Sequence, residues 1–223
     1  MTNTEQHRIS LKLAGFEMIT LCKSQLEKAL EAFINNDEDL AEEVMHMETY
    51  VNAMDLKIEK DCENFFALHN PVAKDLRFTM TILKMTDELE RIGDHAYNIS
   101  KYVVDSEERI QPYLLEILDV DKMRNTLETM MNYITIAYEE KDMKMVRKVF
   151  KKDKILDKIN KKSFKILETE IKKDTNLVLS SLVLFSVVKK LERVGDLIKN
   201  IAEEIIFYVD AEVLKHNKEK RKK

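Results

Sequence analysis

The 223-residue chain has little of what β-rich and disulfide-bonded folds require: it contains three glycines, two prolines, two cysteines and no tryptophan. Because tight β-turns depend on glycine and proline, their scarcity argues against a sheet-rich fold. The two cysteines form no C-x-x-C pair and are too few for a disulfide framework, so we expect reduced thiols. Hydrophobic residues make up 44% of the chain and charged residues 35%, and helix formers dominate, which predicts an all-α fold.

Long apolar runs and a strong excess of one charge are also missing. The most apolar stretch, residues 177–188, is interrupted by serines and is too short to cross a bilayer. Polar residues follow Met1, so we expect no signal peptide and a cytoplasmic protein. The formal net charge of −4 gives no reason to expect nucleic-acid binding. The sequence contains no phosphate-cradling glycine loop, nucleotide motif or nucleophile–base pair.

One sequence motif occurs twice. Residues 89–99 read LERIGDHAYNI and residues 191–201 read LERVGDLIKNI. Two of the three glycines, Gly93 and Gly195, are equivalent members of this pair. A duplication in register indicates that one half-chain architecture is used twice.

Each copy of the motif lies on an amphipathic helical pattern. Apolar residues recur at steps of three and four, which places them on one helix face. They are Ile82, Met85, Leu89, Ile92, Ala96, Ile99 and Val103 in the first copy, and Leu184, Val187, Leu191, Val194, Ile198, Ile201, Ile205 and Tyr208 in the second. A second stripe, roughly opposite, changes from apolar to polar and largely acidic partway along each helix. It carries Asp87, Glu90, Asp94 and Asn98 in the first copy, and Lys189, Glu192, Asp196 and Asn200 in the second.

The acidic stripes suggest a bound cation. Carboxylates four residues apart on one helix face repel each other by a few tenths of a kcal/mol. Because both copies keep this arrangement, we expect a cation to offset it, and oxygen-only ligands favour hard cations or iron. A glycine inside a helix costs about 1 kcal/mol relative to alanine, but directly before each Asp it lets a neighbouring helix or an ion approach. The alternative is a solvent-exposed acidic face balanced by Arg91 and Arg193.

The apolar periodicity predicts three long helices in the first half of the chain. They are expected at residues 4–34, 38–68 and 71–104. Asn70 is the predicted N-cap of the third helix, with Pro71 at its first position.

Three helices are also predicted in the second half, at residues 112–140 and 142–172 and from Asp174 to Leu214. Short connections favour antiparallel neighbours, so each half is expected to form a three-helix bundle. The basic end of the chain is expected to be a disordered tail, or to dock on an acidic partner or an anionic membrane face. The predicted domains are a first bundle (residues 1–105), a second bundle (residues 112–214) and the basic tail (residues 215–223).

The middle helix of each half places side chains where they can face the acidic stripe of the third. Two metal-binding carboxylate clusters are therefore predicted, with Asp87, Asn98 and Asn200 as further ligands or supporting residues. The second cluster has four acids, whereas Asn52 replaces the fourth acid in the first, so the second is the stronger expected site. The clusters are Glu48, Glu90 and Asp94 in the first half, and Asp153, Asp157, Glu192 and Asp196 in the second.

Two alternatives compete with this interpretation. Glu43 and His46 form an E-x-x-H pair, the ligand unit of ferritin-like di-iron bundles, which would make the protein an oxidase. Such a site needs the unit on two helices, and the corresponding residues of the second half are Lys148 and Lys151. The other alternative is a metal-free helical adaptor, whose acidic stripes meet only water or the cations of a partner.

The LER(I/V)GD motif with its following N-I, together with residues 70–77 (NPVAKDLR), resembles the PhoU family of phosphate-transport accessory and phosphate-signalling proteins. The resemblance covers nearly the whole chain. It implies two tandem three-helix bundles that carry metal on E/D-x-x-x-D carboxylates, with Fe, Mg, Mn or Zn as candidate ions. It also implies a non-enzymatic negative regulator, expected as a homodimer. Its expected partners are the ATPase subunit of a phosphate ABC transporter and a sensor histidine kinase, and it would associate with the membrane only through them.

Overall fold

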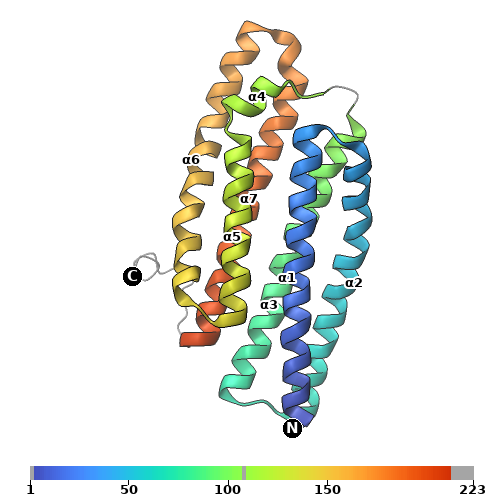
Figure 1. Cartoon of the computed structure of the whole chain (residues 1–223), viewed down its shortest axis with the longest axis vertical. Helices are drawn as coiled ribbons and strands as arrows, with labels where there is room; N and C mark the ends of the chain where they lie inside the picture. Colours follow the sequence, from blue (N-terminus) through green and yellow to red (C-terminus); the bar gives the residue numbers. More distant parts are fainter. Residues whose placement is uncertain (1–2, 107–108, 212–223) are drawn as a thin grey trace.

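The computed structural model describes residues 3–106 and 109–211, and these residues are almost entirely helical and contain no strand (Figure 1). The first half consists of α1 (Asn3–Asn35), α2 (Glu38–His69) and α3 (Ala73–Asp105). The second half consists of α4 (Pro112–Ile117), α5 (Val120–Glu140), α6 (Met143–Lys173), the 3₁₀ helix η1 (Thr175–Leu177) and α7 (Val178–Asp210).

Each half forms a bundle of three long helices, and the two bundles lie side by side (Figure 1). Helices α1, α2 and α3 pack together in the first bundle, as do α5, α6 and α7 in the second. The bundles meet mainly where α3 packs on α7, with a smaller contact between α1 and α5. The predicted all-α fold of two tandem three-helix bundles is therefore confirmed, and both motif helices lie at the centre of the molecule.

The apolar stripes of the motif helices form the core. Ile82 on α3 is 1% exposed, and Leu89, Ile92, Leu191 and Val194 are completely buried. Burying a side chain of this size contributes about 1.5–3 kcal/mol. Packing of these stripes, more than intrinsic helix propensity, therefore stabilises the helices.

The predicted helix at residues 112–140 is wrong, because the structure has two helices there. Helix α4 ends at Ile117 and α5 begins at Val120, and Asp119 between them has a left-handed backbone (φ 55°). Leu118 and Met123 are not three or four positions apart, so one continuous helix could not turn both toward the core. The break at Asp119 allows both to be buried.

The predicted start of the third helix is also wrong. Asn70 ends α2 in a left-handed conformation (φ 44°), and α3 begins at Ala73 after the extended residue Val72. Asparagine tolerates a positive φ at a helix C-terminus, and the following Pro71 cannot continue α2. The sequence signal was real, but it marks the end of one helix and not the first turn of the next.

Other boundaries lie close to their predicted positions. Asp174 accepts a hydrogen bond from the backbone N–H of Asn176 and caps η1, after which α7 begins at Val178. The predicted helix end at Leu214 and the basic tail at residues 215–223 lie outside the described residues. Among the helices that are described, none is long and apolar enough to span a membrane.

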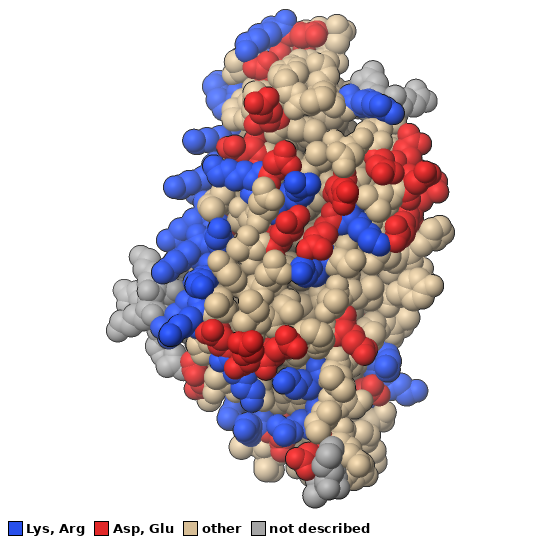
Figure 2. Space-filling model, viewed as in Figure 1, with Lys and Arg blue, Asp and Glu red and all other residues tan. Residues whose placement is uncertain are grey.

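Charge is distributed unevenly between the two bundles. Figure 2 shows basic side chains along the edge of the molecule formed by α6, and acidic side chains gathered over the upper part of α2. Helix α2 contains nine Asp and Glu residues against two Lys, whereas α6 contains twelve Lys and Arg residues against four acidic ones. The small net charge therefore conceals an acidic side that attracts cations and a basic side that repels them.

Candidate metal centre

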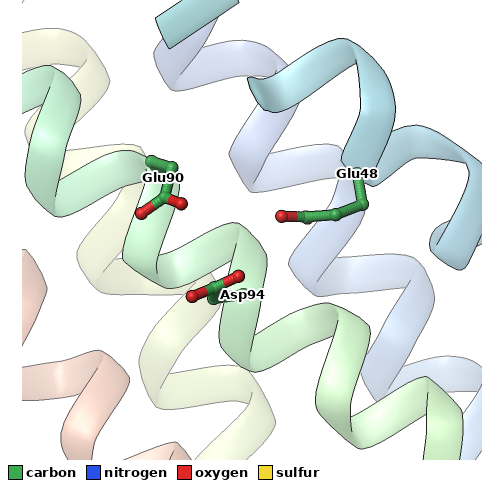
Figure 3. Close-up of side chains that lie close together, drawn as sticks. All are labelled: Glu48, Glu90 and Asp94. Atoms are coloured by element: carbon green, nitrogen blue, oxygen red, sulfur yellow. The ribbon is translucent and has the colours of Figure 1, made fainter. Parts of the chain in front are cut away.

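Three of the predicted ligands converge between α2 and α3 (Figure 3). Glu90 and Asp94 project from α3 one turn apart, and Glu48 reaches toward them from α2. One carboxylate oxygen of each residue lies within 4.8 Å of the other two. In the part of the chain that the structure describes, this is the one set of three or more Asp, Glu, His or Cys side chains that come so close. We call it the first cluster.

Gly93 allows α1 and α2 to approach α3 at the first cluster. A Cβ atom on Gly93 would lie 2.9 Å from Gln25 Oε1 and 3.2 Å from Glu48 Oε2. Gln25 is completely buried on α1, and its Nε2 donates a hydrogen bond of 2.8 Å to Glu48 Oε2. This bond orients the Glu48 carboxylate toward α3.

The second oxygen of Glu48 points to a missing ligand. Glu48 Oε1 is buried and forms no hydrogen bond of ordinary geometry with the described residues, although Asn52 lies near enough to act on the carboxylate. A buried carboxylate oxygen without a partner is costly, and protein structures rarely leave one so. A cation held jointly by Glu48, Glu90 and Asp94 would supply the partner, and its charge would offset their mutual repulsion.

Burial and mutual repulsion both disfavour the charged carboxylates in the absence of a cation. Burial raises the pKa of Glu48, opposed by the hydrogen bond from Gln25 and reinforced by the nearby Asp94 charge. Burial also raises the pKa of Glu90, with further contributions from Asp94 and other acidic neighbours. The first cluster is thus a partly buried set of like charges, which binding of a cation would stabilise.

The raised pKa of Glu48 predicts a pH dependence of stability in metal-free protein. Above pH 4.5, the ordinary value, the folded state holds a proton on Glu48 more readily than the unfolded state. The contribution of Glu48 to stability therefore falls as the pH rises through its folded-state pKa. We expect Glu48→Gln, which cannot ionise, to gain stability relative to the wild type between pH 5 and pH 7 in the presence of a chelator.

Urea denaturation at both pH values measures this gain. Glu42→Gln is the matched control, since Glu42 is exposed on the same helix and its replacement makes the same chemical change. An equal stability difference between Glu48→Gln and the wild type at both pH values would contradict the expectation.

The second predicted cluster is arranged differently. Lys199 lies between Asp153 on α6 and Asp196 on α7, with Nζ 2.7 Å from Asp153 Oδ2 and 2.6 Å from Asp196 Oδ1. Asp157 and Glu192 are near enough for the Asp157 charge to raise the pKa of Glu192, after the larger effect of burial. Of the four acids predicted for this half, Asp153 and Asp196 therefore hold a lysine ammonium between them.

The ionic state of the Asp153–Lys199 pair follows from its surroundings. Burial raises the pKa of Asp153 to about 6 although Lys199 acts to lower it. Burial acts to lower the pKa of Lys199, but the bonds to Asp153 and Asp196 outweigh it and raise the pKa above its ordinary value. The direction of the Lys199 shift and its two short carboxylate contacts make the lysine a cation of this cluster.

Lys199 is the member of the second cluster that the sequence interpretation missed. It follows Asp196 by three positions on α7, a spacing at which side chains of opposite charge meet on a helix. The first copy of the motif has Tyr97 at this place. Comparing the basic as well as the acidic residues of the two copies would have revealed the difference.

Two of the residues predicted as further ligands or supporting residues form hydrogen bonds of their own. Asn98 donates a hydrogen bond of 2.6 Å to the backbone oxygen of Asp94, on its own helix. Asn200 donates to both carboxylate oxygens of Glu88 at 3.2 Å and so links α7 to α3. Asp87 is exposed on α3. Asp87 is not among the converging carboxylates of the first cluster.

The E-x-x-H pair does not contribute to a metal site in the described residues. Glu43 forms an ion pair with Lys28, and His46 is exposed. The first cluster contains no histidine. The geometry therefore gives the di-iron oxidase no support.

Known proteins resemble the chain over most of its length. The family model for the PhoU domain matches residues 16–103 and again residues 120–205. The chain is 31% identical to the phosphate-specific transport system accessory protein PhoU homolog 1 of Thermotoga maritima, over 91% of this chain and 87% of that protein. It is 30% identical to the phosphate-specific transport system accessory protein PhoU of Escherichia coli, over 93% of this chain and 85% of that protein.

Solved structures show the same fold. The crystal structure of PhoU from Pseudomonas aeruginosa has a TM-score of 0.86 with this chain at 26% identity, covering 93% of this chain and 99% of that one. The phosphate transport system regulatory protein PhoU from Streptococcus pneumoniae has a TM-score of 0.80 at 22% identity, covering 95% and 99%.

Proposed function

The chain belongs to the PhoU family, and from this we propose that it is a non-enzymatic accessory protein of phosphate uptake that restrains the phosphate-starvation response. The family model matches both halves of the chain. Relatives covered over most of their own length are named accessory proteins of the phosphate-specific transport system.

The proposed partners are the ATPase subunit of a phosphate ABC transporter and a sensor histidine kinase. The protein would act from the cytoplasm, as a homodimer, and would reach the membrane only through these partners. Exposed apolar side chains on α6 and α7 support a role in protein contacts, since Phe164 and Leu182 are 63% and 59% exposed and line the same surface hollow. Exposed apolar residues that adjoin one another are typical of surfaces that bind other proteins.

A cation at the first cluster is the second part of the proposal. The observation that carries it is the convergence of Glu48, Glu90 and Asp94 within 4.8 Å, beside a buried oxygen of Glu48 that lacks a hydrogen bond. Among the candidate ions Fe, Mg, Mn and Zn, the oxygen-only donor set fits Mg²⁺ or Mn²⁺ best. When bound, the ion supplies positive charge. Glu48 would then hold α2 against α3 and set the shape of the surface offered to the partners.

Co-purification from cells of the source organism tests the proposed partners. We expect the tagged chain to recover the transporter ATPase or the sensor kinase, under high or low phosphate, well above an untagged control. Deletion of its gene should switch on phosphate-starvation genes in phosphate-rich medium. Recovery of neither partner in either medium, with unchanged expression after deletion, would contradict the proposed role.

A further inference from the structure

The two bundles neutralise equivalent acidic clusters in different ways. In the second bundle, Lys199 binds Asp153 and Asp196 at 2.7 and 2.6 Å. In the first bundle the same position of the motif is Tyr97. Among the described residues, no Lys or Arg forms an ion pair with Glu48, Glu90 or Asp94. The second cluster thus contains an ammonium of the chain itself, whereas in the first only the charge of Arg91, which forms no ion pair there, acts on Glu90.

The environment of Lys199 is that of a built ion site and not of a surface contact. The side chains of Lys199 and Asp153 are 20% and 7% exposed. Asp153 Oδ1 is buried without a hydrogen-bond partner among the described residues, while Asp153 Oδ2 binds the ammonium. Buried charges are retained only where opposite charges meet them in good geometry. The ammonium meets one oxygen of each carboxylate at short distance, while Asp153 Oδ1 keeps no hydrogen-bond partner among the described residues and the Asp196 side chain is 38% exposed.

The surrounding helices reinforce the difference between the bundles. Asp153 lies on α6, which carries twelve basic residues against four acidic ones, and Glu48 lies on α2, which carries nine acidic residues against two lysines. Figure 2 shows this separation between the α6 edge and the α2 side. The local field therefore opposes entry of a metal ion at the second cluster and favours it at the first.

We propose that Lys199 is the permanent cation of the second cluster, so that metal binds each chain at the first cluster alone. Metal supply would then control the packing of α2 on α3, while the packing of α6 on α7 stays independent of metal. The prediction that metal changes only the packing of α2 on α3 rests on the proposed function, because it needs a cation at the first cluster. The role proposed for Lys199 is independent of that cation, since it concerns the second cluster only.

Removing the ammonium tests the proposal. Lys199→Met keeps an unbranched side chain but leaves the acids of the second cluster without a cation. Mn²⁺ titration by calorimetry, with bound metal counted by elemental analysis, should show one additional Mn²⁺ site per chain relative to the wild type. Adding Asp153→Asn to this variant should abolish the additional site. Lys151→Met is the matched control, because Lys151 is exposed on a different face of α6 and should leave Mn²⁺ binding unchanged.

A folded Lys199→Met chain that binds no more Mn²⁺ than the wild type overturns the proposal. If Lys199→Met does not fold, the single variant Asp196→Asn provides the test. An unchanged number of bound Mn²⁺ ions per chain supports the proposal, and the loss of one Mn²⁺ site overturns it. Failure of the first cluster is distinguishable, because the wild type would then bind no Mn²⁺ while Lys199→Met still gains a site. Hydrogen exchange adds an independent readout: Mn²⁺ should protect amides of wild-type α2 and α3 but not of α6 and α7.

Discussion

Glu48→Gln combined with Asp94→Asn is expected to weaken Mn²⁺ binding at the first cluster by about 100-fold, a loss of about 2.7 kcal/mol in binding free energy. The two changes remove two of the three converging charges and keep the shape of both side chains. Glu90 alone cannot hold the ion, because a hard cation needs several oxygen ligands at once. Isothermal titration calorimetry measures the change directly.

The same variant should lose metal-dependent stability. For the wild type, Mn²⁺ at 100 times its dissociation constant should stabilise the folded state by about 2.7 kcal/mol. At roughly 2–4 °C per kcal/mol for a chain of this size, the melting temperature should rise by about 5–10 °C. The same concentration equals the weakened dissociation constant of the double variant and should shift its melting temperature by only about 1–2 °C. Glu42→Gln combined with Glu63→Gln, which removes two exposed charges from α2, should keep the wild-type shift. Equal shifts in both double variants would contradict a site at the first cluster.

Gly195→Val should destabilise the second bundle by about 1–3 kcal/mol. A Cβ at Gly195 would overlap Leu156 Cδ1 and lie 3.2 Å from Asp153 Oδ1, and Leu156 is completely buried. Overpacking at such a contact forces side chains from their rotamers and shifts the backbone. The glycine in the motif is therefore required by the close approach of α6, and not by a turn.

Leu156→Ala provides the internal control, because it removes about the volume that Gly195→Val adds. Alone it should cost about 2–5 kcal/mol through the cavity it leaves. Combined with Gly195→Val, the total loss should be smaller than the sum of the single losses by at least about 1 kcal/mol. Urea denaturation of the wild type, the two single variants and the double variant measures this coupling free energy. Strictly additive losses would show that the two side chains do not compete for the same space.

The fold could be predicted from the sequence because its strongest signals are periodic and repeated. Steps of three and four residues identify the buried faces of α3 and α7, and the duplicated motif fixes the two-bundle plan. The positions at which helices end were harder to predict, since they depend on tertiary packing. The interruption at Asp119 is visible only as a slip in apolar spacing, and Asn70 followed by Pro71 is compatible with the end of one helix as well as the start of another.

The carboxylates that converge in the candidate site could be predicted from the sequence, but the ammonium of Lys199 in the second cluster could not. Glu90 and Asp94 belong to one helix face by spacing, and the middle helix offers Glu48 at the matching level, so their convergence follows from the repeat. The second cluster looked stronger because it has more acids. Whether an ammonium enters such a cluster depends on side-chain direction and burial, which spacing alone does not give, so the ion pairs of Lys199 with Asp153 and Asp196 could not be foreseen.

Crystals grown with Mn²⁺ test the central claim most directly, through the anomalous scattering of the ion. The account predicts an anomalous peak between Glu48, Glu90 and Asp94, and none between Asp153 and Asp196, where Lys199 remains in place. A peak at the second position with none at the first would contradict it.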